Sequence, residues 1–231
     1  MANSATSVTI ASKGPSTLRT YLVSELKRQI LEGAYEPGAR LNESQIAREF
    51  DVSRVPVREA LSQLQEQGLL VNRERRGMFV VQLTDDEVQQ INSLRLVLEA
   101  EAMRLARHRM TSEIRAELSD LVSSMEAWDG PLLDAAALDR RFHAVIWAAS
   151  GNPFLERTLH SLTTSLFAHK ALEHVGPEIR RWRLSHHREL FDCVANGVGD
   201  PQIAMLSHLR TAYNEPERFS SLAIAGEDPG K

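Results

Sequence analysis

Four side chains in the second half of the chain have the types and the spacing of metal ligands. Asp139 and His143 are four residues apart, so both project from one face of a helix. His187 and His208 lie in two later helical segments. Three imidazoles and a carboxylate suit a divalent transition ion such as Zn²⁺, Ni²⁺ or Mn²⁺. The alternative is that these histidines are satisfied in a core or solvated, because the chain uses histidine at five further positions: His108, His160, His169, His174 and His186.

Two arginines in the first half have the spacing of DNA-contacting residues. Arg54 and Arg58 are also four residues apart and share the exposed face of a predicted helix. Arginine can form a paired hydrogen bond with guanine in the major groove. The alternative is an ordinary surface helix with two solvated arginines. The opposite face of this helix is an apolar stripe of Val57, Ala60, Leu61 and Leu64.

The elements that would position these arginines form a helix-turn-helix. A first short helix begins after Asn42, a plausible cap, and a tight turn follows at 50–52. Ser53 is the predicted N-cap of the second helix, where its hydroxyl would accept a backbone amide hydrogen bond. Pro56 falls in the first turn of that helix, where a missing N–H costs little.

The flanking segments extend this motif to a winged helix. An amphipathic helix that begins near Leu18 and ends at Gly33 precedes it. The short apolar runs 69–72 and 78–81 follow it, separated by the polar loop 73–77, and predict a β-hairpin. Arg73, Arg75 and Arg76 give the hairpin a basic tip that could reach phosphates or the minor groove.

The remainder of the chain, residues 85–218, is predicted to be helical throughout. Six helices with short connections predict an antiparallel bundle, whose interior is a natural site for a ligand or a metal ion. The fold class is therefore mainly α: an N-terminal winged helix-turn-helix and a C-terminal all-α bundle. The predicted helices cover approximately 88–105, 112–128, 133–149, 154–173, 176–196 and 201–213.

Composition limits the class of protein. The chain has 231 residues, 42% of them hydrophobic, and a net charge of −4. Residues 1–82 carry a balance of +2 and residues 83–231 a balance of −6, which places the basic surface on the predicted winged helix. One cysteine, Cys193, fits a reducing compartment, and we expect it to be buried. No apolar run approaches the roughly 20 residues of a membrane span, so a cytoplasmic protein is expected. Residues 1–15 and 219–231 are predicted to be tails, with 1–15 disordered.

The N-terminal part resembles the DNA-binding domain of GntR-type transcription regulators. This resemblance implies a winged helix-turn-helix over 16–82 in which Arg54 and Arg58 contact DNA and Gly77 lies in the wing. Many relatives carry an arginine at the position aligned with Ser44, so the operator is expected to differ there. The residues that carry the match are Gly33, Tyr35, Pro37, Gly38, Leu41, Glu43, Ala47, Val52 to Arg54, Pro56 to Leu61, Leu64, Gly68, Leu69 and Gly77.

The C-terminal part resembles the FCD ligand-binding domain of the FadR subgroup. The segments 139–143 and 149–153, then His187-Arg188, Asp200 and His208, carry the match. The resemblance implies an effector-binding and dimerisation domain over 85–218. It also implies a metal site whose ligands are Asp139, His143, His187 and His208. The family pattern has histidine followed by arginine, which selects His187 over His186. The helix count resembles the VanR-like branch.

Arg95 is a candidate for effector binding. It lies on the stripe of the first bundle helix that is expected to face inward, and a buried arginine needs an anionic partner. The family suggests a small carboxylate effector beside the metal. The alternatives are an ion pair with a glutamate of another helix, or a side chain that extends to water. Trp128, Trp147 and Trp182 are expected in the core.

The sequence thus predicts a bacterial, homodimeric transcription regulator and no enzyme. It would be a repressor that binds a near-palindromic operator in double-stranded DNA and responds to a small organic acid. Two other functions remain open: a metal-dependent hydrolase with a winged-helix appendage, and a sensor in which the metal ion is the signal. The sequence supplies no recognisable catalytic base or nucleophile motif, which favours the regulator.

Overall fold

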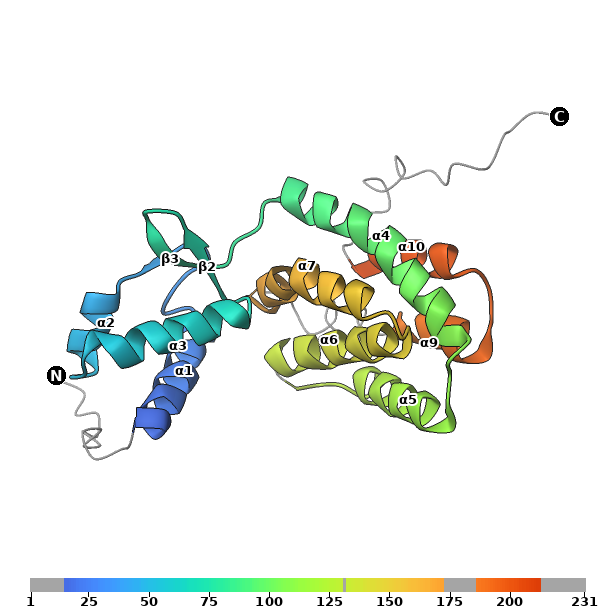
Figure 1. Cartoon of the computed structure of the whole chain (residues 1–231), viewed down its shortest axis with the longest axis horizontal. Helices are drawn as coiled ribbons and strands as arrows, with labels where there is room; N and C mark the ends of the chain where they lie inside the picture. The colour runs from blue at the N-terminus through green and yellow to red at the C-terminus, as the bar shows by residue number, and fades with distance from the viewer. Residues whose placement is uncertain (1–14, 131, 173–185, 213–231) are drawn as a thin grey trace. The chain divides into compact units, whose positions relative to one another are not determined.

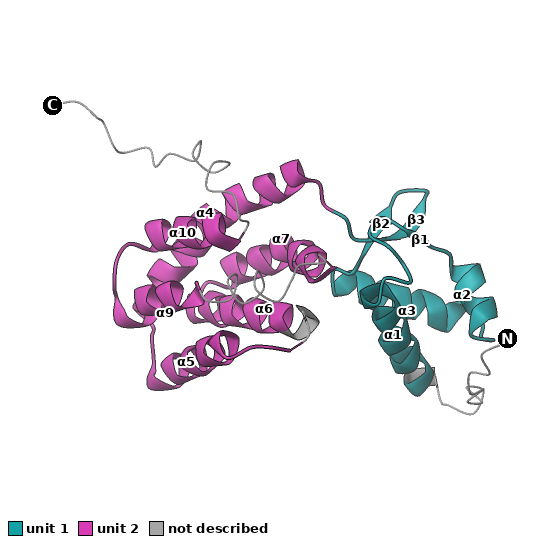
Figure 2. Ribbon diagram, turned by 180° about the vertical axis from the view of Figure 1, so that it is seen from behind, with its two compact units in different colours: residues 1–82 teal, residues 83–231 magenta. Residues whose placement is uncertain are grey.

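The computed structural model describes residues 15–130, 132–172 and 186–212, which divide into two compact units, 1–82 and 83–231 (Figure 2). The predicted tails lie outside the described residues, except that Pro15 begins the first helix. Trp182, His174 and the start of the predicted helix before His187 also lie outside them. Within the described ranges, no helix has the length and apolar character needed to cross a bilayer.

Unit 1 has the predicted winged helix-turn-helix architecture, which confirms that part of the fold class. Its sheet has the order β1-β3-β2 with antiparallel pairs, in which Leu41 lies opposite Met78 and Arg73 opposite Gly77. The two-residue strand β1 was not predicted, because it is too short to show alternation. The elements are α1 (Pro15–Leu31), β1 (Arg40–Leu41), α2 (Glu43–Glu49), α3 (Arg54–Glu66), β2 (Leu70–Arg73) and β3 (Gly77–Val80).

The core of unit 1 explains how α3 is held. Its predicted apolar stripe is buried, with Val57, Ala60 and Leu64 at 0% exposure and Leu61 at 1%. Burying each of the valine and leucine side chains contributes roughly 1.5–3 kcal/mol. The opposite face of α3 therefore stays in solvent on a rigid support. The stripe packs in a core that also contains Leu22, Leu26 and Ile30 of α1, Ile46 of α2 and Val80 of β3.

The two short helices begin differently. Asn42 caps α2 as predicted, since its side chain accepts hydrogen bonds from the amides of Ser44 (2.9 Å) and Gln45 (3.2 Å). Ser53 occupies the N-cap position of α3, but its side chain makes no capping hydrogen bond, so that part of the prediction is wrong. One of the two N–H groups that such a cap can bind is missing, because the third residue of α3 is Pro56.

Unit 2 is the predicted helical bundle (Figure 1). In the described residues α6 packs against α5 and α7, while α4 packs against α10, α6 and α7. Thr84 and Glu87 form a capping box at the start of α4. The helices are α4 (Asp85–Arg107), α5 (Ser112–Glu126), α6 (Leu132–Ala149), α7 (Pro153–Leu172), α9 (His187–Asn196) and α10 (Pro201–Ala212).

The bundle core contains the tryptophan and cysteine side chains that were predicted to lie there and that the structure describes. Trp147 is completely buried, and the half-buried Trp128 packs against the main core. Cys193 is 1% exposed, as expected for a small buried residue, and its sulfur accepts a hydrogen bond from Arg107. Trp147 and Cys193 are thus part of the bundle core, as predicted.

Candidate functional site

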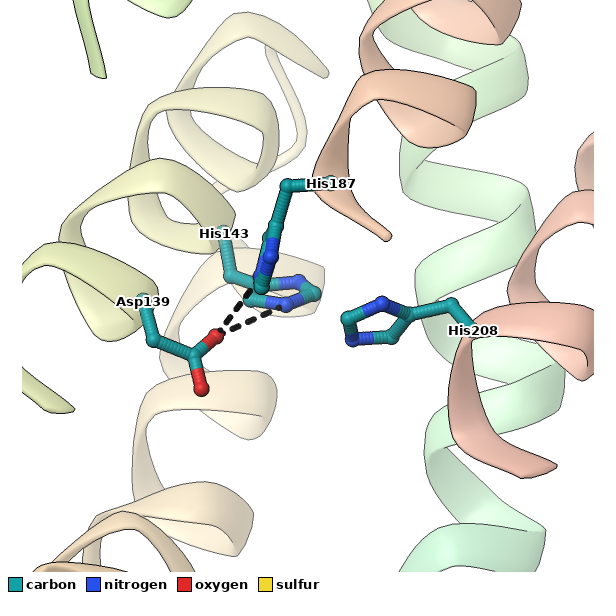
Figure 3. Close-up of side chains that lie close together, drawn as sticks. All are labelled: Asp139, His143, His187 and His208. Carbon is teal, nitrogen blue, oxygen red and sulfur yellow. Dashed lines mark hydrogen bonds and ion pairs between the residues drawn. The ribbon is translucent and has the colours of Figure 1, made fainter. Parts of the chain in front are cut away.

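The four predicted metal ligands lie together inside unit 2. Asp139 and His143 come from α6, His187 from the start of α9 and His208 from α10. Each side chain offers a ligand atom, and these atoms all lie within 4.8 Å of one another. Figure 3 shows the four side chains pointing toward a common centre. We call Asp139, His143, His187 and His208 the histidine cluster.

The contacts within the histidine cluster leave a buried nitrogen without a hydrogen-bond partner among the described residues. Asp139 Oδ1 lies 3.3 Å from His143 Nε2 and 3.0 Å from His187 Nε2. His208 Nδ1 is buried and has no hydrogen-bond partner among the described residues. Leaving a buried polar atom unsatisfied costs roughly 1–3 kcal/mol. A divalent transition ion fits this donor set, because it would bind the imidazole nitrogens and the carboxylate together.

The charge states of Asp139 and His208 suit a metal ion. Burial raises the pKa of the Asp139 carboxyl, but hydrogen bonds with His143 and His187 outweigh it and hold that pKa well below the usual value. Burial, together with the nearby His187 and His143, holds the pKa of His208 well below the usual value. An ionised carboxylate and a neutral imidazole are the forms that bind a metal.

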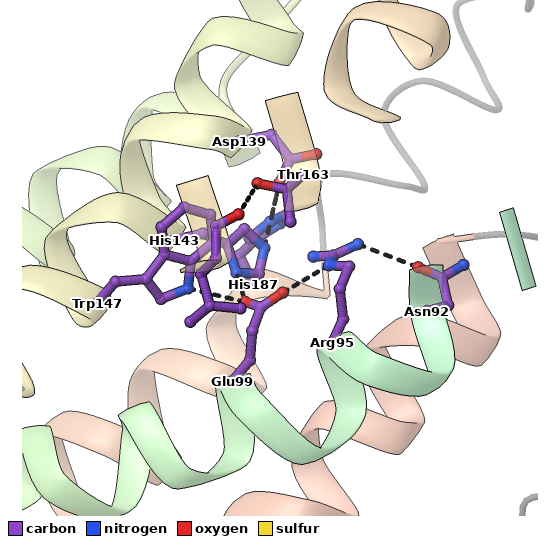
Figure 4. A network of polar contacts seen from close by, with 9 residues as sticks. Asn92, Arg95, Glu99, Asp139, His143, Trp147, Thr163 and His187 are labelled. Carbon is purple, nitrogen blue, oxygen red and sulfur yellow. Dashed lines mark hydrogen bonds and ion pairs between the residues drawn. The ribbon is translucent and has the colours of Figure 1, made fainter. Parts of the chain in front are cut away.

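A buried carboxylate that the sequence reasoning missed adjoins the cluster. Glu99, on α4, accepts hydrogen bonds from Arg95 Nε (2.5 Å) and Trp147 Nε1 (3.2 Å), and its Oε2 lies 2.6 Å from His143 Nδ1 (Figure 4). Burial raises the pKa of Glu99, but Arg95 and His143 outweigh it and bring that pKa to about 2. We call Arg95, Glu99, His143 and Trp147 the Glu99 network.

The Glu99 network orients a candidate metal ligand. An ionised carboxylate can only accept hydrogen bonds, so Nδ1 of His143 carries a hydrogen. Its Nε2 is then the nitrogen directed toward Asp139 and the rest of the cluster. Burial lowers the pKa of His143, but Glu99 and Asp139 outweigh it, and the net effect is a raised pKa. Such a carboxylate behind a histidine is a common support for a metal ligand.

Arg95 is buried, as expected, but its anionic partner is on its own helix. The side chains of Arg95 and Glu99 are both 1% exposed and one turn apart on α4, whereas the alternative in the sequence analysis placed a glutamate on another helix. The guanidinium also lies over the Phe167 ring at 5.4 Å. The four-residue spacing from Arg95 to Glu99 was the signal available in the sequence. Binding of an effector by Arg95 stays a prediction.

On unit 1, the two predicted DNA-contacting arginines share one glutamate. Arg54 and Arg58 are 60% and 64% exposed, and Glu43 of α2 is 27% exposed. Arg54 Nη2 donates to Glu43 Oε2 at 3.2 Å, and Arg58 Nη2 donates to the same oxygen at 3.0 Å. Ser44 and Ser53 are also exposed. We call Glu43, Arg54 and Arg58 the surface triad; sequence reasoning gave Glu43 no role.

The wing presents the other predicted DNA contacts. Arg75 and Arg76 are exposed in the turn between β2 and β3. Arg75 and Gly77 have positive φ angles of 59° and 93°, the backbone that reverses this hairpin. Arg73 lies over the Phe79 ring at 4.6 Å, which anchors it to the sheet. Arg75 and Arg76 are thus left at the tip.

Comparisons with known proteins agree with this geometry. The model of bacterial regulatory proteins of the gntR family matches residues 18–80, and the FCD domain model matches residues 90–211. The chain is 29% identical over 184 residues to the uncharacterised HTH-type transcriptional regulator YdhC of Bacillus subtilis, covering 77% of this chain and 81% of the relative. It is 28% identical over 190 residues to the HTH-type transcriptional repressor RspR of Escherichia coli, with 80% and 82% covered.

A solved structure of E. coli McbR/YncC has a similar fold, with a TM-score of 0.60 and 23% sequence identity over 85% of this chain and 95% of that one. The winged helix, the bundle and the two family matches together define a DNA-binding transcription regulator. The chain belongs to the GntR family of regulators that carry an FCD domain. The assignment to the VanR-like branch stays a prediction.

Proposed function

We propose that this protein is a homodimeric, cytoplasmic repressor that binds a near-palindromic operator and is controlled by a small organic acid. The observation that carries the proposal is the presence of two complementary sites in one chain. One is an exposed arginine pair on a rigidly supported helix. The other is a buried cluster of metal-type ligands. The name of the relative RspR, a transcriptional repressor, supports the direction of control.

In this proposal α3 is the recognition helix. Arg54 and Arg58 contact guanine edges, and Ser53 and Ser44 lie beside them as polar contacts. In the wing, Arg75 and Arg76 contact phosphates and the Gly77 backbone allows the close approach. The 60% and 64% exposure of the two arginines supports their accessibility to DNA.

The histidine cluster is proposed to hold a divalent transition ion such as Zn²⁺, Ni²⁺ or Mn²⁺. The ion would supply a Lewis acid that attracts a carboxylate. Asp139 and the three histidines would be its protein ligands, and Glu99 would fix the ring of His143. Arg95 would contribute the positive charge that favours an acidic effector. The convergence of four ligand atoms within 4.8 Å supports this assignment.

Dimerisation follows from the proposed operator, because a near-palindrome is read by two symmetry-related winged helices. We place the main interface in unit 2. On α4, Leu94 and Val97 are 52% and 62% exposed, so this helix carries apolar surface outside the bundle core. Sedimentation of residues 83–231 alone tests this point. A monomer at tens of micromolar, with a dimeric full chain, would place the interface elsewhere.

The central experiment tests the acid and the ion together. An operator is selected from random duplexes with the full chain, and small carboxylates are screened by thermal shift with and without a chelator. We expect a carboxylate that stabilises the metal-loaded protein and weakens operator binding. If the metal ion alone reversibly changes operator binding, the protein is a metal sensor instead. Turnover of esters or phosphoesters would indicate a hydrolase.

A further inference from the structure

The first residue of α2 contacts both arginines proposed to read DNA. Glu43 Oε2 accepts hydrogen bonds from Arg54 and Arg58, and Arg58 Nε also lies 3.2 Å from Glu43 Oε1. The Asn42 cap fixes the backbone from which Glu43 projects. The surface triad therefore connects the two helices of the helix-turn-helix through one carboxylate.

The orientation of Arg58 leaves a defined edge for DNA. A guanidinium has a side edge, formed by Nε and Nη2, and an end edge, formed by Nη1 and Nη2. Arg58 uses its side edge on Glu43. The end edge can still donate two parallel hydrogen bonds to O6 and N7 of a guanine. Since Arg58 is 64% exposed, this edge is accessible to a large partner.

The ion pairs of Glu43 with the two arginines are poorly explained by stability. Ion pairs between exposed side chains contribute little to folding, because water screens the charges and two long side chains must be ordered. The same pairing matters more for recognition. An arginine already held by a carboxylate loses less conformational freedom when it binds a base, and the carboxylate repels a phosphate that approaches the same site.

We infer that Glu43 is a specificity-determining residue, which holds Arg54 and Arg58 in position for base contacts and disfavours their use on phosphates. This inference rests on the proposed function, in which these arginines read the operator. It adds that the selectivity for the operator depends on a residue outside the recognition helix. Hydrogen bonding by Arg58 lowers the pKa of Glu43, so the carboxylate is ionised at neutral pH.

The experiment compares operator and scrambled duplex with the full-length chain. The operator is selected with the wild type from random duplexes. Affinities for both duplexes are then measured by fluorescence anisotropy over a series of salt concentrations. The variants are Glu43→Gln, which removes the charge, and Glu43→Asp, which keeps the charge but shortens the side chain. The matched control is Glu49→Gln, which removes an exposed charge from the other end of α2.

Glu43→Gln is expected to reduce the ratio of operator to scrambled affinity by about tenfold, which corresponds to ~1.4 kcal/mol. The loss should come mainly from tighter binding of the scrambled duplex, with a salt slope steeper by about 1. Glu43→Asp should lower the ratio without steepening the slope, because the charge remains while the reach to both arginines is lost. Glu49→Gln should leave the ratio unchanged.

Three results would overturn the inference. The first is an unchanged affinity ratio in both Glu43 variants, and the second is an equal change in the Glu49 control. The third is a loss of preference confined to one base pair with unchanged scrambled binding, which would mean that Glu43 reads a base itself. The proposed function fails separately, if the wild type selects no sequence at all.

Discussion

The surface triad and the Glu99 network use the same ionic chemistry in opposite surroundings. In each, one glutamate contacts two basic side chains: Glu43 contacts Arg54 and Arg58 of α3, and Glu99 contacts Arg95 of its own helix and His143 of α6. The arginines of the surface triad are 60% and 64% exposed, whereas Arg95 and Glu99 are each 1% exposed. Water screens the first set of charges and is excluded from the second. The same bonds are therefore easily exchanged for a new partner in unit 1 and held firmly in unit 2.

This difference in exposure matches the proposed roles of the surface triad and the Glu99 network. A DNA-reading arginine must form new hydrogen bonds when the operator arrives, so a weak, exposed restraint is suitable. A metal ligand must keep one ring orientation, so a desolvated restraint is suitable. The desolvation of the Glu99 network has a consequence for stability, because removing one member leaves a buried charge without its partner.

The largest expected effect is therefore at Glu99. Glu99→Gln removes the negative charge that compensates Arg95 and should lower the free energy of unfolding by about 3–5 kcal/mol. Chemical denaturation of the full chain measures this loss. The matched control is Glu101→Gln on the same helix, whose ion pair with Arg104 is exposed at 46% and 54%. Equal losses at the two positions would contradict the contrast between the buried and exposed pairs.

Metal binding should give the next largest effect. Because the histidine cluster joins α6, α9 and α10, an ion bound there should stabilise unit 2 by roughly 3–4 kcal/mol at a hundred- to thousandfold excess over its Kd. Elemental analysis and thermal unfolding with and without a chelator measure it. His187→Ala should lose the metal, while His160→Ala, whose side chain is 47% exposed, should keep it.

Two outcomes would change this interpretation. Full metal content in His187→Ala would show that the ligand assignment is wrong. If the metal is lost but a carboxylate hit binds with unchanged affinity, the ion is structural and the proposed coupling between metal and signal is wrong. Titration of the same acid into Arg95→Ala separates the role of the arginine from that of the ion.

The sequence could predict the residues of the histidine cluster better than the Glu99 network beside it. The spacing of Asp139 and His143 placed them on one helical face, and the structure brings His187, rather than His186, into the cluster with them. Periodicity cannot place residues of α6, α9 and α10 at one point, so this gathering rested on the resemblance. Glu99 was missed because an acid four residues after an arginine is ordinary on any solvated helix.

In unit 1, the sequence predicts the helices and the wing but not the contacts between α2 and α3. The helices, the wing and the exposed arginines follow from periodicity and turn residues, and the structure contains them. Glu43 lies 11 and 15 residues from its two partners, so its contacts depend on how the turn between α2 and α3 folds. The missing Ser53 cap accompanies a finer detail, the absence of an N–H at Pro56. Neither is visible in a hydrophobic pattern.

Smaller effects are expected on DNA binding. Arg54→Ala and Arg58→Ala should each weaken operator binding about ten- to a hundredfold while scrambled duplex is affected much less, because a bidentate base contact is lost. Anisotropy with both duplexes measures this. Arg28→Ala, which removes a charge from α1, serves as the control. Unchanged footprints for both Arg54 and Arg58 variants would refute their assignment as base contacts.

The wing arginines should contribute similarly to the binding of operator and of scrambled duplex. Arg75→Ala and Arg76→Ala should weaken operator and scrambled duplex by a similar factor and flatten the salt slope by about 1 each, since phosphate contacts carry no sequence information. The salt dependence of both affinities is the measurement. A change in sequence preference with an unchanged slope would instead assign these side chains to bases in the minor groove.

The smallest expected effect completes the comparison between the two glutamates. Glu43→Gln makes the same chemical change as Glu99→Gln, but at a side chain that is 27% exposed and paired with solvated arginines. It should lower the free energy of unfolding by less than about 1 kcal/mol, because water takes over the hydrogen bonds of both arginines. Denaturation of the two variants under one set of conditions measures the difference. A loss at Glu43 as large as that at Glu99 would mean that the surface triad holds the helix-turn-helix together, and a change of DNA specificity in Glu43→Gln would then reflect an altered fold.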